Sequence, residues 1–137
     1  MGQTNPNPTS GTTSLHPQNV VNIFLTAAAV PAHIIMHARD VVGISSSALA
    51  ETLKQLHESN IRRVLVVAEV AGQRLVSEAV IYRRFDRRSG RTYFWLYPLQ
   101  PAQALLRDML RKYRGDAPYN AKRPLPITIL AVAPKLR

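Results

Sequence analysis

Hydrophobic residues follow a helical spacing in one early segment of the chain. Leu49, Leu53 and Leu56 recur at i, i+4 and i+7, which predicts a helix over 48–60 with one buried face. The three serines at 45–47 precede this helix, and serine side chains commonly cap helix N-termini. The exposed side of the helix carries both signs of charge in near balance, so it is a poor candidate for reading a DNA groove.

The period then changes to that of β-strands. Three strand-like runs cover 62–70, 74–85 and 91–98, and the turns between them contain Gly72 and Gly90. This pattern predicts a three-stranded antiparallel meander. Apolar residues occupy both faces of the first run, which predicts that this strand is central in the sheet.

The remaining elements lie at the two sides of this meander. A helix is predicted from Pro101 to about Arg114, because proline suits the first helical position and glycine follows the last one. The run 127–133 lies between prolines, which predicts a short strand at the end or the edge of the sheet. Before the first helix, a strand is predicted over 33–38, and the segment 20–29 fits either a helix or a strand, with the helix preferred.

These elements predict a single α+β domain over 18–137. We expect an antiparallel sheet of four or five strands, with two or three helices packed mainly on one face. Residues 1–17 are almost entirely Thr, Ser, Asn, Pro and Gly, which predicts a flexible polar tail. The apolar run 20–36 is too short and too interrupted to cross a bilayer, so no transmembrane segment and a cytoplasmic location are expected.

Charge is distributed very unevenly along the chain. The 137 residues include 18 Lys and Arg against 8 Asp and Glu, a formal net charge of +10. The five basic and five acidic residues of 1–81 cancel, so the whole excess lies in the last 56 residues. A local excess of this kind predicts a surface that binds a polyanion, although a basic surface can also serve solubility alone.

Arginine and aromatic side chains gather around the second turn of the meander. Alternate strand residues share a face, and those on one side are Arg91, Tyr93, Trp95 and Tyr97. Guanidinium groups bind phosphates, and aromatic rings stack on unpaired bases for about 1 to 3 kcal/mol each. Together with the cations of the last helix, they predict a surface for RNA or single-stranded DNA. The predicted nucleic-acid-binding residues are Arg83, Arg84, Arg87, Arg88, Arg91, Tyr93, Trp95, Arg107, Arg111, Lys112 and Arg114.

The same residues also allow a purely structural interpretation. In it, Tyr93 and Trp95 pack under the last helix, and the arginines only keep an exposed loop in solution. The interpretations differ in salt dependence. If about six of the cations engage phosphates, log affinity should fall with log salt at a slope of roughly −4 on single strands.

Known chemical motifs are missing from the chain. It contains no cysteine, no glycine-rich phosphate loop, no KH-type GXXG loop and no RNP1 spacing. His33 and His37 stand at i and i+4 without a third ligand, so no metal site is predicted, and both are expected to be packed or hydrogen-bonded. Since the carboxylates are scattered, we expect no enzyme, no cofactor and no small-molecule substrate.

A competing function is assembly. The uncharged first 38 residues and the predicted edge strand over 127–133 could mediate self-association into a homo-oligomer. The basic face of such a scaffold protein would then dock an acidic partner or lipid headgroups.

Overall fold

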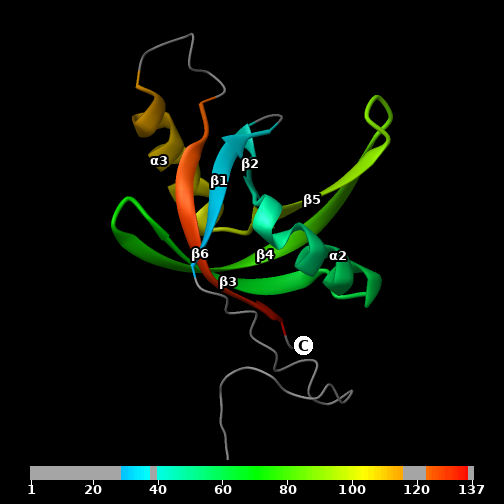
Figure 1. The fold of residues 1–137 in the computed structure, drawn as a ribbon. Coiled ribbons are helices and arrows are strands. Elements are labelled where there is room, and N and C mark those ends of the chain that lie inside the picture. Colours follow the sequence, from blue (N-terminus) through cyan, green and yellow to red (C-terminus); the bar gives the residue numbers. More distant parts are fainter. Residues whose placement is uncertain (1–28, 38–39, 116–122, 136–137) are drawn as a thin grey trace, which may run out of the picture.

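Six antiparallel strands of the described chain close into a barrel (Figure 1). The computed structural model describes residues 29–37, 40–115 and 123–135. The predicted tail over 1–17 and nearly all of the predicted element over 20–29 lie outside these ranges. The strands are β1 (Val30–Met36), β2 (Val42–Ser45), β3 (Arg63–Val70), β4 (Gln73–Asp86), β5 (Arg91–Pro98) and β6 (Leu125–Pro134). Their order around the barrel is β1-β2-β5-β4-β3-β6, and the pairing of β6 with β1 closes the barrel.

The predicted meander is confirmed as β3, β4 and β5. Ala71 and Gly72 join β3 to β4 with φ of 50° and 78°, the left-handed backbone that a two-residue hairpin turn requires. β4 is long enough to serve two partners, since Gln73–Val80 pair with β3 and Ala79–Asp86 pair with β5. The far part of the β4–β5 hairpin therefore projects beyond the barrel (Figure 1).

The barrel closes through β6, so the prediction of an edge strand at 127–133 is wrong. β6 pairs with β1 from Val30↔Ile129 to Ile34↔Leu125, and it also pairs with β3. The register of β3 and β6 shifts between Val67 and Ala68, and such an irregularity increases the local twist that closure needs. Self-association through this strand therefore loses its basis, and self-association itself stays a prediction.

The helices do not cover one face of a sheet, so the predicted α+β class is wrong. They are the 3-10 turn η3 (Ser47–Leu49), α2 (Ala50–Glu58) and α3 (Ala102–Arg114), and α2 and α3 lie on opposite sides of the barrel (Figure 1). The inner faces of the strands cover one another instead, and the helices contribute buried leucines. The largest fully buried side chains are Ile34, Val42, Leu53, Val64, Leu96, Leu106, Leu110, Ile129 and Val132.

The two predicted helices are confirmed, with slightly shorter bounds. α2 runs from Ala50 to Glu58 and α3 from Ala102 to Arg114. Neither helix, nor any other in the described residues, combines the length and the hydrophobicity that a bilayer crossing requires.

The strand β2 is missing from the sequence prediction, which assigned the serines beside it to a helix cap. No serine side chain caps the η3 or α2 N-terminus; the Ser46 hydroxyl instead donates to the Pro31 carbonyl at 2.8 Å. Only four residues long, β2 carries no readable alternation, because Val42, Gly43 and Ile44 are all buried. Ser46 thus occupies the N-cap position of η3, as predicted, but its hydroxyl group ties η3 to β1 instead of capping the helix.

One buried glutamine fastens α3 to the barrel. The Val42 amide donates to Gln103 Oε1 at 2.5 Å, and Gln103 Nε2 donates to the Pro98 carbonyl at 2.8 Å. On the exposed side of α3, Arg107 donates to the Asp40 carbonyl at 3.3 Å, and Arg111 forms an ion pair with the Asp40 carboxylate at 2.9 Å. These contacts place the end of α3 beside the β1–β2 connection.

Candidate nucleic-acid interface

The outer wall of the barrel carries a row of rings and guanidinium groups on β4 and β5. Residues opposite each other on antiparallel strands share a face, and the pairs here are Tyr82 with Trp95 and Arg84 with Tyr93. Because their neighbour Leu96 points into the core, these side chains point outward. The packing of Tyr93 and Trp95 under the last helix, which the structural interpretation required, is therefore wrong, and a solubility role for the arginines stays a prediction.

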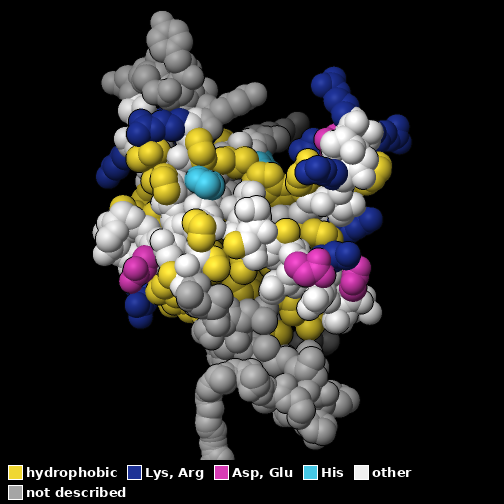
Figure 2. All heavy atoms as spheres, in the orientation of Figure 1, with side chains coloured by type: hydrophobic (Ala, Val, Ile, Leu, Met, Phe, Trp, Pro, Cys, Tyr) yellow, Lys and Arg dark blue, Asp and Glu magenta, His cyan; other side chains and the backbone are white. Residues whose placement is uncertain are grey.

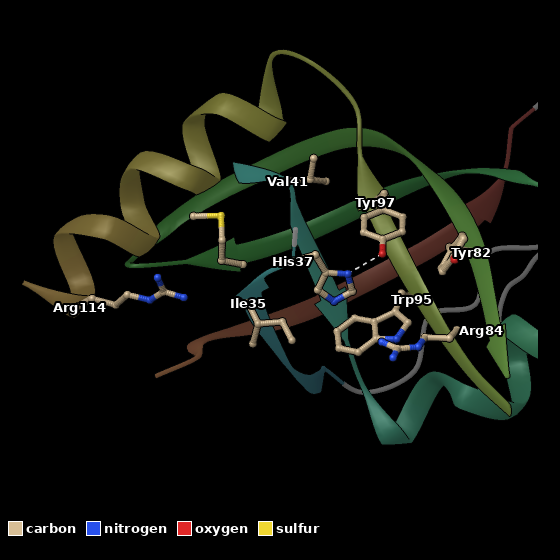
Figure 3. Close-up of a pocket in the computed structure, with 9 residues that line it drawn as sticks. Ile35, His37, Val41, Tyr82, Arg84, Trp95, Tyr97 and Arg114 are labelled. Carbon is tan, nitrogen blue, oxygen red and sulfur yellow. Dashed lines mark hydrogen bonds between the residues drawn. The ribbon is translucent and has the colours of Figure 1, made fainter. Parts of the chain in front are cut away.

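A hollow of about 730 Å³ opens on this wall (Figure 3). We call it the ring pocket, and its lining comes from β1, the β1–β2 connection, β4, β5 and the last turn of α3. The lining residues are Ile35, Met36, His37, Val41, Tyr82, Arg84, Trp95, Tyr97 and Arg114.

The rings of this pocket hold one another in place. His37 Nδ1 lies 2.5 Å from the Tyr97 hydroxyl, within hydrogen-bond distance. The His37 ring also meets Trp95 edge-on, with 4.3 Å between ring centroids. The ring centroids of Tyr82 and Tyr97 lie 5.3 Å apart, and these two rings are tilted against each other. Such edge-to-face pairs are favourable, so the pocket presents a set of aromatic surfaces that is already assembled.

Gly43 of β2 forms part of the support beneath these rings. A Cβ atom at this position would lie 3.1 Å from Tyr97 Cε1 and 3.4 Å from His37 Cε1. A glycine inside a strand often marks such a close approach. The missing side chain therefore lets both rings lie against the barrel wall.

Burial and a neighbouring cation control ionisation in the ring pocket. Burial, and then the charge of Arg84, lower the pKa of His37. Burial, and then the neighbouring Tyr82, raise the pKa of Tyr97. At neutral pH the hydrogen-bonded pair is therefore uncharged, and the positive charge of the pocket comes from Arg84 and Arg114.

A second hollow of about 540 Å³ continues toward the hairpin tip. We call it the tip pocket, and it is lined by Arg84, Asp86, Arg87, Arg88, Tyr93 and Trp95. Asp86 accepts hydrogen bonds from the Ser89 hydroxyl at 2.9 Å and the Arg88 amide at 3.2 Å, which lower its pKa and hold the turn. Arg84 and Trp95 border both hollows, so the two hollows are neighbours along the hairpin.

Six of the eleven predicted binding residues line these hollows, and five lie elsewhere. Arg83 is on the opposite face of β4. There its charge helps to lower the pKa of His57, although burial and the charge of Arg62 have larger effects. Arg107 and Arg111 contact Asp40, and Arg91 and Lys112 are exposed and line neither of these two hollows. Figure 2 shows Lys and Arg at the hairpin tip and over α3, with hydrophobic side chains between them.

Sequence reasoning missed several residues of the ring pocket. Tyr97 was placed on the correct face but not among the binding residues, and His37 was considered only as a metal ligand or packed side chain. The others are Ile35, Met36, Val41 and Tyr82. Within the ranges that the structure describes, no group of three His, Asp or Glu side chains is placed to hold a metal ion.

The lowered pKa of His37 predicts how stability depends on pH. Unfolding returns this ring to its ordinary pKa of about 6.5, so the unfolded chain binds more protons between the two pKa values. The free energy of unfolding should therefore fall as the pH drops through this window, and His37→Gln should flatten the slope. An NMR titration of the His37 ring measures the pKa directly. A midpoint at or above 6.5 would contradict the effect of burial and Arg84.

Comparison with protein families, with curated proteins and with solved structures finds no match to this chain.

Proposed function

We propose that this protein binds single-stranded nucleic acid, RNA or DNA, along the outer face of the β4–β5 hairpin. The observation that carries the proposal is the position of Arg84 and Trp95, which border both the ring pocket and the tip pocket. Each hollow thus has a ring for stacking and a guanidinium group for a phosphate. Binding without catalysis and a cytoplasmic location are parts of this proposal that come from the sequence alone.

The rings are accessible for stacking. Tyr93 is 42% exposed, and Trp95, although half-buried, faces both hollows. Bases stack on such rings whatever their identity, because every base has a flat π-face. Bases inside a duplex are already stacked and unreachable, so this arrangement favours single strands.

The hairpin cations are available for phosphates. Among the described residues, the ion pairs involve Arg63, Arg74, Arg111 and Lys135. Arg84, Arg87 and Arg88 are exposed and take part in none of these pairs. A phosphate would therefore not have to displace a carboxylate from them.

The two neighbouring arginines of β4 provide a matched test. Arg84→Gln should weaken binding of a labelled 20-mer about five- to tenfold at 0.1 M salt, because it removes one phosphate contact, made by the guanidinium group that borders both hollows. Arg83→Gln makes the same charge change on the opposite face and should have less than about a twofold effect. Fluorescence polarisation with single-stranded RNA, single-stranded DNA and duplex DNA measures these affinities.

Salt dependence tests the same proposal independently. If Arg84, Arg87, Arg88 and Arg114 all engage phosphates, log affinity should fall with log salt at a slope of about −3 on single strands. Arg84→Gln should make this slope shallower by about 0.7. Equal losses in the two arginine variants, or no binding at low salt, would remove the proposal.

A further inference from the structure

The ring pocket has a guanidinium group at each end. Figure 3 shows Arg84, from β4, on one side of the lining and Arg114, from α3, on the other, with the rings of His37 and Trp95 between them. Among the described residues that line it there is no aspartate or glutamate. The pocket thus complements a flat, apolar group with a negative charge at either side.

Arg114, which lines this pocket, has one buried donor without a partner. Its Nε atom is buried and, among the residues that the structure describes, has no hydrogen-bond partner. Buried donors in folded proteins are nearly always satisfied, and an unsatisfied one calls for a physical explanation. An anionic oxygen in the ring pocket would form charge-assisted hydrogen bonds with the guanidinium group of Arg114, which lines the pocket.

α3 borders the ring pocket through Arg114. Val41 and Arg114, from the β1–β2 connection and α3, line the side opposite the hairpin, and the tip pocket adjoins the other side through Arg84 and Trp95. A strand that runs along the hairpin would enter the ring pocket past Arg84 and then meet α3. Its last base would stack among the rings, and its end would reach Arg114.

We infer that the ring pocket binds the end of a nucleic-acid strand that carries a terminal phosphate. The inference rests on the proposed function and names its preferred ligand. A terminal phosphate monoester carries about −1.5 to −2 charges at neutral pH, more than the single charge of an internal phosphate. It therefore gains more from Arg114 than a hydroxyl end does. The chemistry is the same for a 5′ and a 3′ phosphate.

Three internally labelled 12-mers of one sequence test this, with a 5′ phosphate, a 3′ phosphate or hydroxyls at both ends. One of the phosphorylated strands should bind about tenfold more tightly than the hydroxyl-ended strand, and the 5′ and 3′ arms identify which. Arg114→Gln should abolish this difference, so that the phosphorylated and the hydroxyl-ended strands bind this variant equally tightly. Lys112→Gln, an exposed cation on the same helix, should leave the difference intact.

A measurement on the unmodified protein needs no variant. Adenosine 5′-monophosphate, adenosine 3′-monophosphate and adenosine are each titrated against Trp95 fluorescence. The preferred monophosphate should change the fluorescence at concentrations about tenfold below those that adenosine requires. Equal affinity for all three 12-mers would overturn the terminal-phosphate inference and leave the proposed function standing. Failure of every strand to bind at low salt would overturn both.

Discussion

Replacement of Leu106 by alanine is expected to lower the free energy of unfolding by about 2 to 5 kcal/mol. Leu106 lies on α3 and has no exposed surface, and it lines a small internal cavity with Val66, Ala68 and Ile127. Its removal enlarges a cavity at the point where α3 closes the barrel, and β strands paired on both sides cannot collapse to fill it. Urea denaturation followed by circular dichroism measures the loss.

The neighbouring leucine supplies the control. Leu105 is 44% exposed, so Leu105→Ala should cost less than about 1 kcal/mol. If the two variants lose similar stability, α3 does not seal the barrel in the way that the burial of Leu106 indicates.

Trp95→Ala is expected to weaken binding of single-stranded nucleic acid by about five- to 150-fold, which corresponds to about 1 to 3 kcal/mol of base stacking. Trp95 is the ring shared by the ring pocket and the tip pocket, and it also supports His37 at 4.3 Å. Its loss should therefore affect both hollows together. Fluorescence polarisation with the labelled 20-mer measures the change at a fixed salt concentration.

Phe85 provides the matched aromatic control on the same hairpin. It is 54% exposed and alternates with Arg84, so its ring lies on the opposite face of β4. Phe85→Ala should change the affinity by less than about twofold, and circular dichroism checks that both variants keep the fold. A loss in Phe85→Ala as large as that in Trp95→Ala would place the binding surface elsewhere.

Short-range patterns were sufficient for the meander, for both helices and for part of the candidate site. Turn glycines, alternation and helical spacing act over a few residues, and they correctly located β3, β4, β5, α2 and α3. The side chains of the tip pocket come from one hairpin, so strand alternation alone brought Arg84, Tyr93 and Trp95 to one face.

The ring pocket depends on contacts between distant parts of the chain. His37 and Tyr97 are 60 positions apart and meet only because β2 lies between β1 and β5, with Gly43 beneath both rings. The four residues of β2 are too few to show an alternation of apolar and polar residues, so the local sequence did not predict this strand. The arrival of Arg114 depends in turn on Gln103, which fastens α3 to Val42.

Periodicity and charge along the chain thus indicated which segments form helices and strands and where the cations concentrate, because both follow from near neighbours. They could not predict the closed barrel, because a strand with one apolar face fits an open sheet and a barrel equally well. The pairing of β6 with both β1 and β3 distinguished these architectures. That long-range pairing also placed β1 and α3 beside the basic, aromatic hairpin, so that the ring pocket is lined by all of them. Burial and surface shape depend on which parts of the chain the fold brings together, and local patterns do not contain that information.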